Sequence, residues 1–201
     1  MVRIVLASRN AGKIREIHAM FAESGVEILS LNDCPGVPEI TEDGSSFQEN
    51  ALKKARVVAE ATGEIALADD SGLEVDALAG APGIYSARYA GQDADDRKNI
   101  RKLLDDMRDF PSERRRAAFR CVLVLYRPGG NFETFEGRWE GMIAEEPAGE
   151  GGFGYDPVFF LPEEGVTVAQ LPPGVKNRSS HRAQAFARLR ESLLKSDKIG
   201  A

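Results

Sequence analysis

The sequence is poor in cysteine and contains no long apolar run. Its two cysteines, Cys34 and Cys121, lack the paired spacing of metal-binding or redox motifs, so we interpret both as buried or incidental thiols of a reducing compartment. No segment approaches the roughly 18 consecutive apolar residues of a membrane span, and no signal peptide fits the strand-like start of the sequence. These absences predict a cytoplasmic protein without a membrane partner.

The sequence also lacks internal repeats, low-complexity tracts and linker-like boundaries. Its 201 residues fit a single domain, which we place over residues 1–201. A content of 42% hydrophobic and 29% charged residues is typical of a globular protein. The net charge of −6 argues against nucleic acid as the main partner, because binding a polyanion requires clustered cations. An anionic small molecule remains compatible if positive charge is concentrated locally.

The order of the apolar runs predicts an α/β fold with a mixed sheet. Strands are expected at residues 2–7, 26–31, 65–68, 119–126, 132–142 and 158–161. Helices are expected after residue 13, at 46–62, at about 94–107 and from about residue 180. Pro128-Gly129-Gly130 joins two of the strands as a hairpin. Strand–helix units combined with a hairpin indicate both parallel and antiparallel neighbours in the sheet.

A short polar loop, Ser8 to Lys13, joins the first strand to the first helix. A helix N-terminus presents unpaired amides to an anion, Asn10 supports a tight turn, and Lys13 adds a positive charge. The loop does not have the Gly-x4-Gly-Lys-Ser/Thr spacing of a Walker motif. It therefore predicts either a phosphate site of another kind or a simple strand-to-helix turn.

The helix expected at 46–62 carries two polar residues in its apolar sector. Asn50 and Lys54 are four residues apart and share one face, between Phe47, Val57 and Ala61. Either their polar ends reach out at the edge of that sector or they point into a cleft. Lys54 is the stronger functional candidate.

Two adjacent acidic residues, Asp69 and Asp70, follow a buried strand and precede Ser71 and Gly72. Sheet proteins commonly build sites at strand ends. Neighbouring strand residues face opposite sides, so the two carboxylates need not act together. One of them, with Glu42, could hold Mg²⁺, which favours carboxylate oxygens plus substrate phosphates. A helix cap or a plain loop is the alternative.

The loop over residues 147–157 has four glycines around two aromatic residues. An aromatic ring in such a loop offers a stacking face to a nucleobase. The alternative is a flexible loop with Phe153 tucked into the core.

The last helix begins with two basic residues, His181 and Arg182, shortly after Lys176. Positive charge at a helix start opposes the helix dipole, and Arg182 aligns with the inward residues Phe186 and Leu189. This placement predicts either a bound anion or an internal ion pair.

Five motifs occur in order along the chain: Ser8-x-Asn10-x-x-Lys13, Ala68-Asp69-Asp70-Ser71-Gly72-Leu73, Gly80-Ala81-Pro82-Gly83-Ile84-Tyr85-Ser86-Ala87-Arg88, Gly152-Phe153-Gly154-Tyr155-Asp156-Pro157 and Ser180-His181-Arg182. Together they resemble the inosine/xanthosine triphosphate pyrophosphatases, house-cleaning enzymes of the purine nucleotide pool. The resemblance runs from Val2 to about Leu194. Arg9 departs from it, because many members of the family carry a small residue there.

The resemblance implies a single two-lobed α/β domain with a long, curved mixed sheet flanked by helices. The active site would lie in a cleft between the lobes, and the usual assembly would be a homodimer. The implied reaction is Mg²⁺-dependent hydrolysis of ITP, dITP and XTP to the monophosphate and pyrophosphate.

The resemblance also implies roles for particular residues. Asp70, Lys13 and Lys54 would be catalytic, and Asp70 with Glu42 would hold one or more Mg²⁺ ions per subunit. Substrate contacts would come from Ser8, Arg9, Asn10, Ala11, Gly12, Lys13, Ser71, Phe153, Gly154, Tyr155, Asp156, Lys176, His181 and Arg182.

Recognition of a 6-keto purine requires a donor facing O6 and an acceptor facing N1–H. Our hypothesis is that Arg182 or His181 donates to O6 and that Asp156 accepts from N1–H. Three alternatives are a phosphatase, a pyrimidine-directed pyrophosphatase and a nucleotide-binding sensor without turnover. Retention of Asp70, Glu42 and Lys13 speaks against the sensor.

Overall fold

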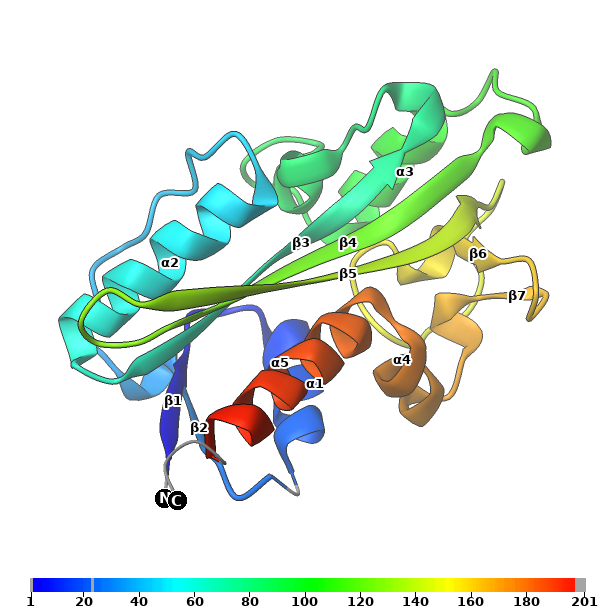
Figure 1. The fold of residues 1–201 in the computed structure, drawn as a ribbon. Helices are drawn as coiled ribbons and strands as arrows, with labels where there is room; N and C mark the ends of the chain where they lie inside the picture. The colour runs from blue at the N-terminus through cyan, green and yellow to red at the C-terminus, as the bar shows by residue number, and fades with distance from the viewer. Residues whose placement is uncertain (1, 23, 198–201) are drawn as a thin grey trace. The chain divides into compact units, whose positions relative to one another are not determined.

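The computed structural model describes residues 2–22 and 24–197, and within them seven strands form one mixed sheet (Figure 1). The strands are β1 (Arg3–Leu6), β2 (Glu27–Ser30), β3 (Ile65–Val75), β4 (Arg116–Tyr126), β5 (Phe132–Ile143), β6 (Phe159–Leu161) and β7 (Val166–Thr167). Their order is β2-β1-β3-β4-β5-β6-β7. β1 pairs in parallel with β2 and β3, whereas β6 pairs antiparallel with β5 and β7. The predicted mixed α/β sheet is confirmed.

The helices are α1 (Ala11–Phe21), α2 (Phe47–Thr62), α3 (Asp96–Asp106), α4 (Pro173–Ser179) and α5 (His181–Asp197). Side-chain oxygens of Asn10, Ser46 and Asp95 cap the first three by accepting from backbone amides of the first turn. Gly63 ends α2 in the left-handed conformation. The predicted helices are confirmed near their expected bounds, while α4 and β7 are short elements that the sequence pattern did not predict.

The chain divides into two compact units, and β3, β4 and β5 contribute residues to both. The first unit contains the described residues of 1–70, 121–137 and 182–201. The second unit contains residues 71–120 and 138–181. The single-domain boundaries and the cleft between lobes stay predictions.

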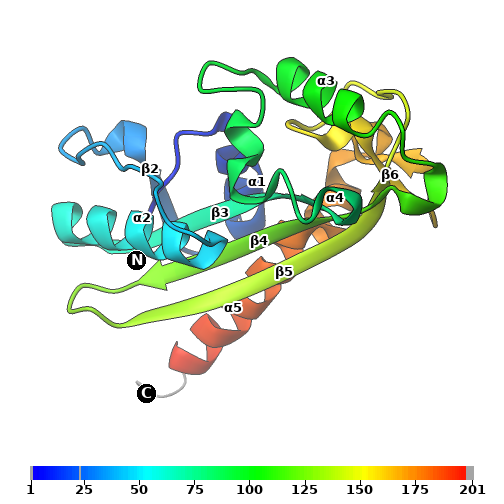
Figure 2. The ribbon, with the colours of Figure 1, turned by 90° about the horizontal axis from the view of Figure 1, so that it is seen from above.

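In the first unit, helices lie on both sides of the sheet. Figure 1 shows α2 on one side and α1 with α5 on the other, and Figure 2 shows the same helices from above. Phe21 of α1 meets Phe186 of α5 edge to face, with ring centroids 4.7 Å apart. The core of this unit is Ile4, Leu6, Ile17, Phe21, Leu67, Cys121, Leu123, Leu125, Phe135, Ala185, Phe186 and Leu189.

The second unit has its own apolar core, which includes α3 and the segment around β6. Phe159 packs against Phe119 with ring centroids 4.3 Å apart. The core consists of Leu73, Val75, Ile100, Leu103, Met107, Ala117, Phe119, Ile143, Tyr155, Val158, Phe159, Leu161 and Val168.

The strand predicted at 65–68 is longer than expected and runs to Val75. Asp69 and Asp70 therefore lie within β3 and not after its end, which corrects the prediction. Aspartate and glycine are poor strand formers. Lys13, Lys54 and Arg182 contact the two carboxylates in the folded chain, and this pairing permits charged residues in a buried strand. Among the described residues, no helix is long and apolar enough to cross a membrane.

Candidate active site

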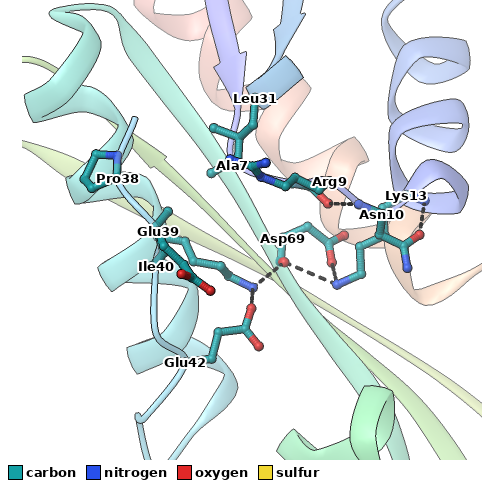
Figure 3. A pocket seen from close by; sticks show the side chains of 12 residues that line it. Ala7, Arg9, Asn10, Lys13, Leu31, Pro38, Glu39, Ile40, Glu42 and Asp69 are labelled. Atoms are coloured by element: carbon teal, nitrogen blue, oxygen red, sulfur yellow. Dashed lines mark hydrogen bonds and ion pairs between the residues drawn. The ribbon is translucent and has the colours of Figure 1, made fainter. Parts of the chain in front are cut away.

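A cavity of about 480 Å³ opens in the first unit, above β3 and beside the start of α1 (Figure 3). Its walls come from the loop before α1, the segment before α2, the α2 helix and β3. The lining residues are Ala7, Ser8, Arg9, Asn10, Lys13, Leu31, Pro38, Glu39, Ile40, Glu42, Lys54 and Asp69.

The loop from Ser8 to Lys13 is held by its own side chains. Ser8 Oγ accepts a hydrogen bond from the Asn10 amide at 3.2 Å, and Asn10 Oδ1 accepts from the Lys13 amide at 3.0 Å. Ala11 and Gly12 form the start of α1, whose first turn contains no acidic residue. The positive end of the helix is therefore not neutralised locally and suits an anion.

Two lysines from different elements converge on β3. Lys54 Nζ lies 2.7 Å from both Glu42 Oε1 and Asp70 Oδ1, and 2.9 Å from the carbonyl oxygen of Asp69. Lys13 Nζ lies 2.7 Å from Asp69 Oδ1 and 3.3 Å from the same carbonyl oxygen. Lys54 is only 7% exposed, so its ammonium points inward and does not reach out at the edge of α2.

Burial changes the ionisation of the central groups. It raises the pKa of the Asp70 carboxyl, although Lys54 and Lys13 act in the opposite direction. Burial would lower the pKa of Lys54, but the charges of Asp70 and Glu42 outweigh it and raise that pKa. The site thus combines a firmly charged ammonium with a carboxylate that protonates more readily than an ordinary aspartate.

Arg182 forms a buried ion pair with Asp69 and Glu16. It is 1% exposed, its Nε donates to Asp69 Oδ2 at 2.6 Å, and its Nη1 contacts Glu16 Oε2. Burial would raise the pKa of Asp69, but Arg182 and Lys13 together hold it well below its usual range. Of the two interpretations of Arg182, the contacts favour the internal ion pair over a donor to the base.

Sequence reasoning missed Glu16 and the structural role of Asp69. Glu16 lies three residues after Lys13 and is largely buried in α1. A glutamate on the inward face of a helix, beside Ile17, is the signal that would have indicated a buried cationic partner.

The carboxylates of Glu42 and Asp70 fit a divalent cation whose remaining ligands are water and substrate oxygens. Glu42 and Asp70 contact the same Lys54 nitrogen at 2.7 Å each, so their contacting oxygens are at most twice that distance apart. No group of three or more His, Cys, Asp or Glu side chains able to hold a metal ion occurs in the described part of the chain. Mg²⁺ is commonly bound through one or two carboxylates plus substrate phosphates, so two protein ligands suffice.

A second polar group lies in the second unit, around the loop that begins at Gly152. Asp156 is buried, its Oδ2 accepts from the Phe153 amide at 2.9 Å, and it forms an ion pair with Lys176. The Lys176 ammonium lies 4.5 Å from the centroid of the Phe153 ring. Gly152 has φ +74°, and a Cβ there would lie 1.9 Å from Asp156 Oδ2, so this turn requires glycine.

The remaining candidates from the second unit lie as follows. Tyr155 belongs to the core and donates to the Ser86 carbonyl at 2.9 Å, and burial raises its pKa. His181 stacks on Phe119 with centroids 4.8 Å apart. The Gly154 amide donates to Asp96 at 2.7 Å, and Ser71 lies in β3. Their convergence with the cavity of the first unit stays a prediction.

Comparison with known proteins places this arrangement in a family. The model of the Ham1 family matches residues 4–192. A dITP/XTP pyrophosphatase of Geobacter sulfurreducens is 54% identical over 193 residues, which cover 96% of this chain and 97% of that protein. A dITP/XTP pyrophosphatase of Escherichia coli (strain K12) is 49% identical over 195 residues, which cover 96% of this chain and 98% of that protein.

Solved structures give the same result. A HAM1 protein from Coxiella burnetii has a TM-score of 0.89 at 43% identity, with 97% of this chain and 100% of that chain covered. The Ham1 protein of Staphylococcus aureus has a TM-score of 0.86 at 41% identity, with 96% and 99% covered. Because both the family model and these relatives span nearly the whole sequence, the chain belongs to the Ham1 family.

Proposed function

We propose that the protein hydrolyses non-standard purine nucleoside triphosphates, namely ITP, dITP and XTP, to the monophosphate and pyrophosphate. The observation that carries the proposal is that Lys13, Lys54 and Glu42 line one cavity of the first unit and that Lys54 also forms an ion pair with Asp70. The relatives named dITP/XTP pyrophosphatase support the choice of substrate.

The triphosphate is expected to bind over the loop from Ser8 to Lys13. Splitting off pyrophosphate requires water to attack the α-phosphorus while negative charge develops on the leaving group, so catalysis rests on positioning and electrostatics. The amides at the start of α1 and the ammonium groups of Lys13 and Lys54 supply positive charge at this place. Asp69 holds Lys13, and Arg182 with Glu16 holds Asp69.

Asp70 is proposed to orient and deprotonate the attacking water. In the metal-free protein burial raises the pKa of its carboxyl, and Mg²⁺ bound there would act in the opposite direction and favour the carboxylate that a general base requires. We propose that Glu42 and Asp70 hold Mg²⁺ when the substrate is present. Mg²⁺ would neutralise charge on the phosphate oxygens.

The base is proposed to contact the group around Phe153 in the second unit. The Phe153 ring offers a stacking face, and Asp156 and His181 supply polar atoms for a 6-keto purine. With Arg182 paired inside the first unit and Lys176 paired with Asp156, His181 is the residue better suited to donate to O6.

The test is a product assay on purified protein with ITP, XTP, GTP, ATP and dTTP, with and without Mg²⁺. We expect pyrophosphate and monophosphate from ITP and XTP only when Mg²⁺ is present. Orthophosphate as the first product would indicate a phosphatase, and preference for dTTP would indicate a pyrimidine-directed enzyme. Tight ITP binding without hydrolysis would establish a sensor and contradict the proposal.

Arg9 is expected to strengthen triphosphate binding. Within the part of the chain that the structure describes, it lines the cavity without an ion pair, whereas Lys13 and Lys54 each form ion pairs with carboxylates. We expect Arg9→Ala to raise KM for ITP about 10-fold, equivalent to about 1.4 kcal/mol, because a charge-assisted phosphate contact is lost. Added salt should reduce the difference in KM between Arg9→Ala and the wild type, because salt screens exposed charges.

The matched control for Arg9 is Arg15→Ala. Arg15 is exposed on α1, carries the same charge and does not line the cavity. Equal KM values in the two variants would show that only net charge matters and would remove Arg9 from the substrate contacts.

We also propose that the enzyme acts in the cytoplasm as a homodimer, as the sequence resemblance implies. Sedimentation of the purified protein measures its assembly.

A further inference from the structure

Asn50 is a buried polar residue that the proposed chemistry does not use. It lies in α2 and is 1% exposed, and apart from Asn50 and Lys54 the buried residues of that helix are apolar. Its Oδ1 accepts a hydrogen bond from the Gly44 amide at 2.8 Å. Its Nδ2 is buried and has no hydrogen-bond partner among the described residues. A half-satisfied buried amide is unfavourable for stability, so stability does not explain an asparagine at this position.

The contact of Asn50 belongs to a set that joins the preceding loop to α2. Four consecutive loop residues each meet one helix side chain, in the pairs Glu42–Lys54, Asp43–Lys53, Gly44–Asn50 and Ser45–Glu49. The Asp43 and Ser45 pairs are exposed, so they contribute little to holding the loop against α2. The Gly44–Asn50 contact is part-buried and involves the backbone itself.

The loop backbone packs directly on Asn50. A Cβ at Gly44 would lie 2.7 Å from Asn50 Oδ1 and 2.9 Å from Glu49 Cβ. Only glycine allows this approach, and any side chain there would push the loop away from the helix. Gly44 is two residues after Glu42, so its position limits where the Glu42 carboxylate can lie.

Glu42 needs such a restraint because its side chain is about one-third exposed, and ordering a glutamate side chain costs conformational entropy. Its carboxylate must remain beside Lys54, which also holds Asp70. We propose that Asn50 is a positioning residue: its side-chain oxygen fixes the backbone at Gly44 and thereby holds Glu42 beside Asp70 for Mg²⁺. This proposal rests on the proposed function, because it concerns the Mg²⁺ dependence of the same site.

The principal test replaces Asn50 with leucine, whose side chain has the same number and branching of heavy atoms but is somewhat larger and has no acceptor. An apolar side chain suits this buried place, and the Gly44 amide that loses its acceptor is only part-buried and can bind water once the loop moves, so we expect the melting temperature to stay within a few degrees of wild type. We expect the Mg²⁺ concentration for half-maximal activity to rise about 10-fold, while KM for ITP at saturating Mg²⁺ stays unchanged. Replacing a residue with only a structural role would instead lower the melting temperature and leave the Mg²⁺ concentration for half-maximal activity unchanged.

Hydrogen exchange of the nucleotide-free protein gives a readout independent of activity. Exchange over residues 42–45 should become faster in Asn50→Leu and stay at the wild-type rate in the control Gln48→Ala. Gln48 is an exposed amide residue of the same helix, two positions away. The control should also keep the wild-type Mg²⁺ requirement.

Two further variants keep the test decisive if Asn50→Leu does not fold. Gly44→Ala displaces the loop without altering the core and should raise the Mg²⁺ requirement in the same way. Asn50→Asp keeps the acceptor, so residues 42–45 should exchange hydrogen at the slow wild-type rate. A wild-type Mg²⁺ requirement in Gly44→Ala, or in a folded Asn50→Leu, would overturn the proposal. Absence of Mg²⁺-dependent pyrophosphate release by the wild type would instead contradict the proposed function.

Discussion

Replacement of Asp70 with asparagine is expected to lower kcat by at least about 100-fold, the usual contribution of a positioned general base. The substitution keeps the size of the side chain and removes its charge. Lys54 would retain Glu42 and the Asp69 carbonyl oxygen as partners, so the geometry of the cavity should persist. Steady-state turnover of ITP at saturating Mg²⁺ measures the effect, and circular dichroism checks that folding is intact.

The control for this substitution is Asp76→Asn, which neutralises an exposed aspartate just after β3. It should leave kcat unchanged. Turnover within a few-fold of wild type in Asp70→Asn would remove Asp70 from its assigned role.

The pH dependence gives a second view of Asp70. A general base acts as the carboxylate, so kcat should fall as pH decreases through its pKa. Burial raises the pKa of Asp70 in the metal-free protein, and Mg²⁺ held by the same carboxylate would lower it, so the acid limb should move to lower pH as the Mg²⁺ concentration increases. The pH–rate profile of the wild type at limiting and at saturating Mg²⁺ measures this limb, and an acid limb that stays in the same place at both concentrations would contradict the assignment.

Replacement of Arg182 with alanine is expected to cause the largest loss of stability. The side chain is buried and pairs with Asp69 and Glu16, so its removal leaves two buried carboxylates with less compensation. Breaking a buried ion pair by removing one partner costs about 3–5 kcal/mol. For a chain of this size that corresponds to a fall in melting temperature of roughly 6–20 °C. Thermal unfolding followed by circular dichroism measures it.

The matched control is Arg190→Ala, on the exposed side of the same helix α5. It should change the free energy of unfolding by no more than about 0.5 kcal/mol. If Arg182→Ala is as stable as Arg190→Ala and the preference for ITP over ATP is lost, Arg182 serves the base and not the internal ion pair.

The sequence by itself determined the elements and most of the candidate residues. The alternation of apolar runs indicated strands and helices, because their periodicity follows from local geometry. Asn50 and Lys54 stood out because they are polar residues in the apolar sector of a helix. The loop from Ser8 to Lys13 stood out because it joins a strand to a helix N-terminus and carries a positive charge.

Only the tertiary structure decided which charges meet. Asp69 and Arg182 are 113 residues apart, and Glu16 and Arg182 are 166 apart, so no local pattern could pair them. The same long-range pairing extended β3 through two aspartates, against their local preference. Ion pairs form between residues that are close in space, whereas secondary-structure propensity depends on neighbours along the chain. The sequence therefore indicates the elements, and only the folded structure shows which charged residues pair.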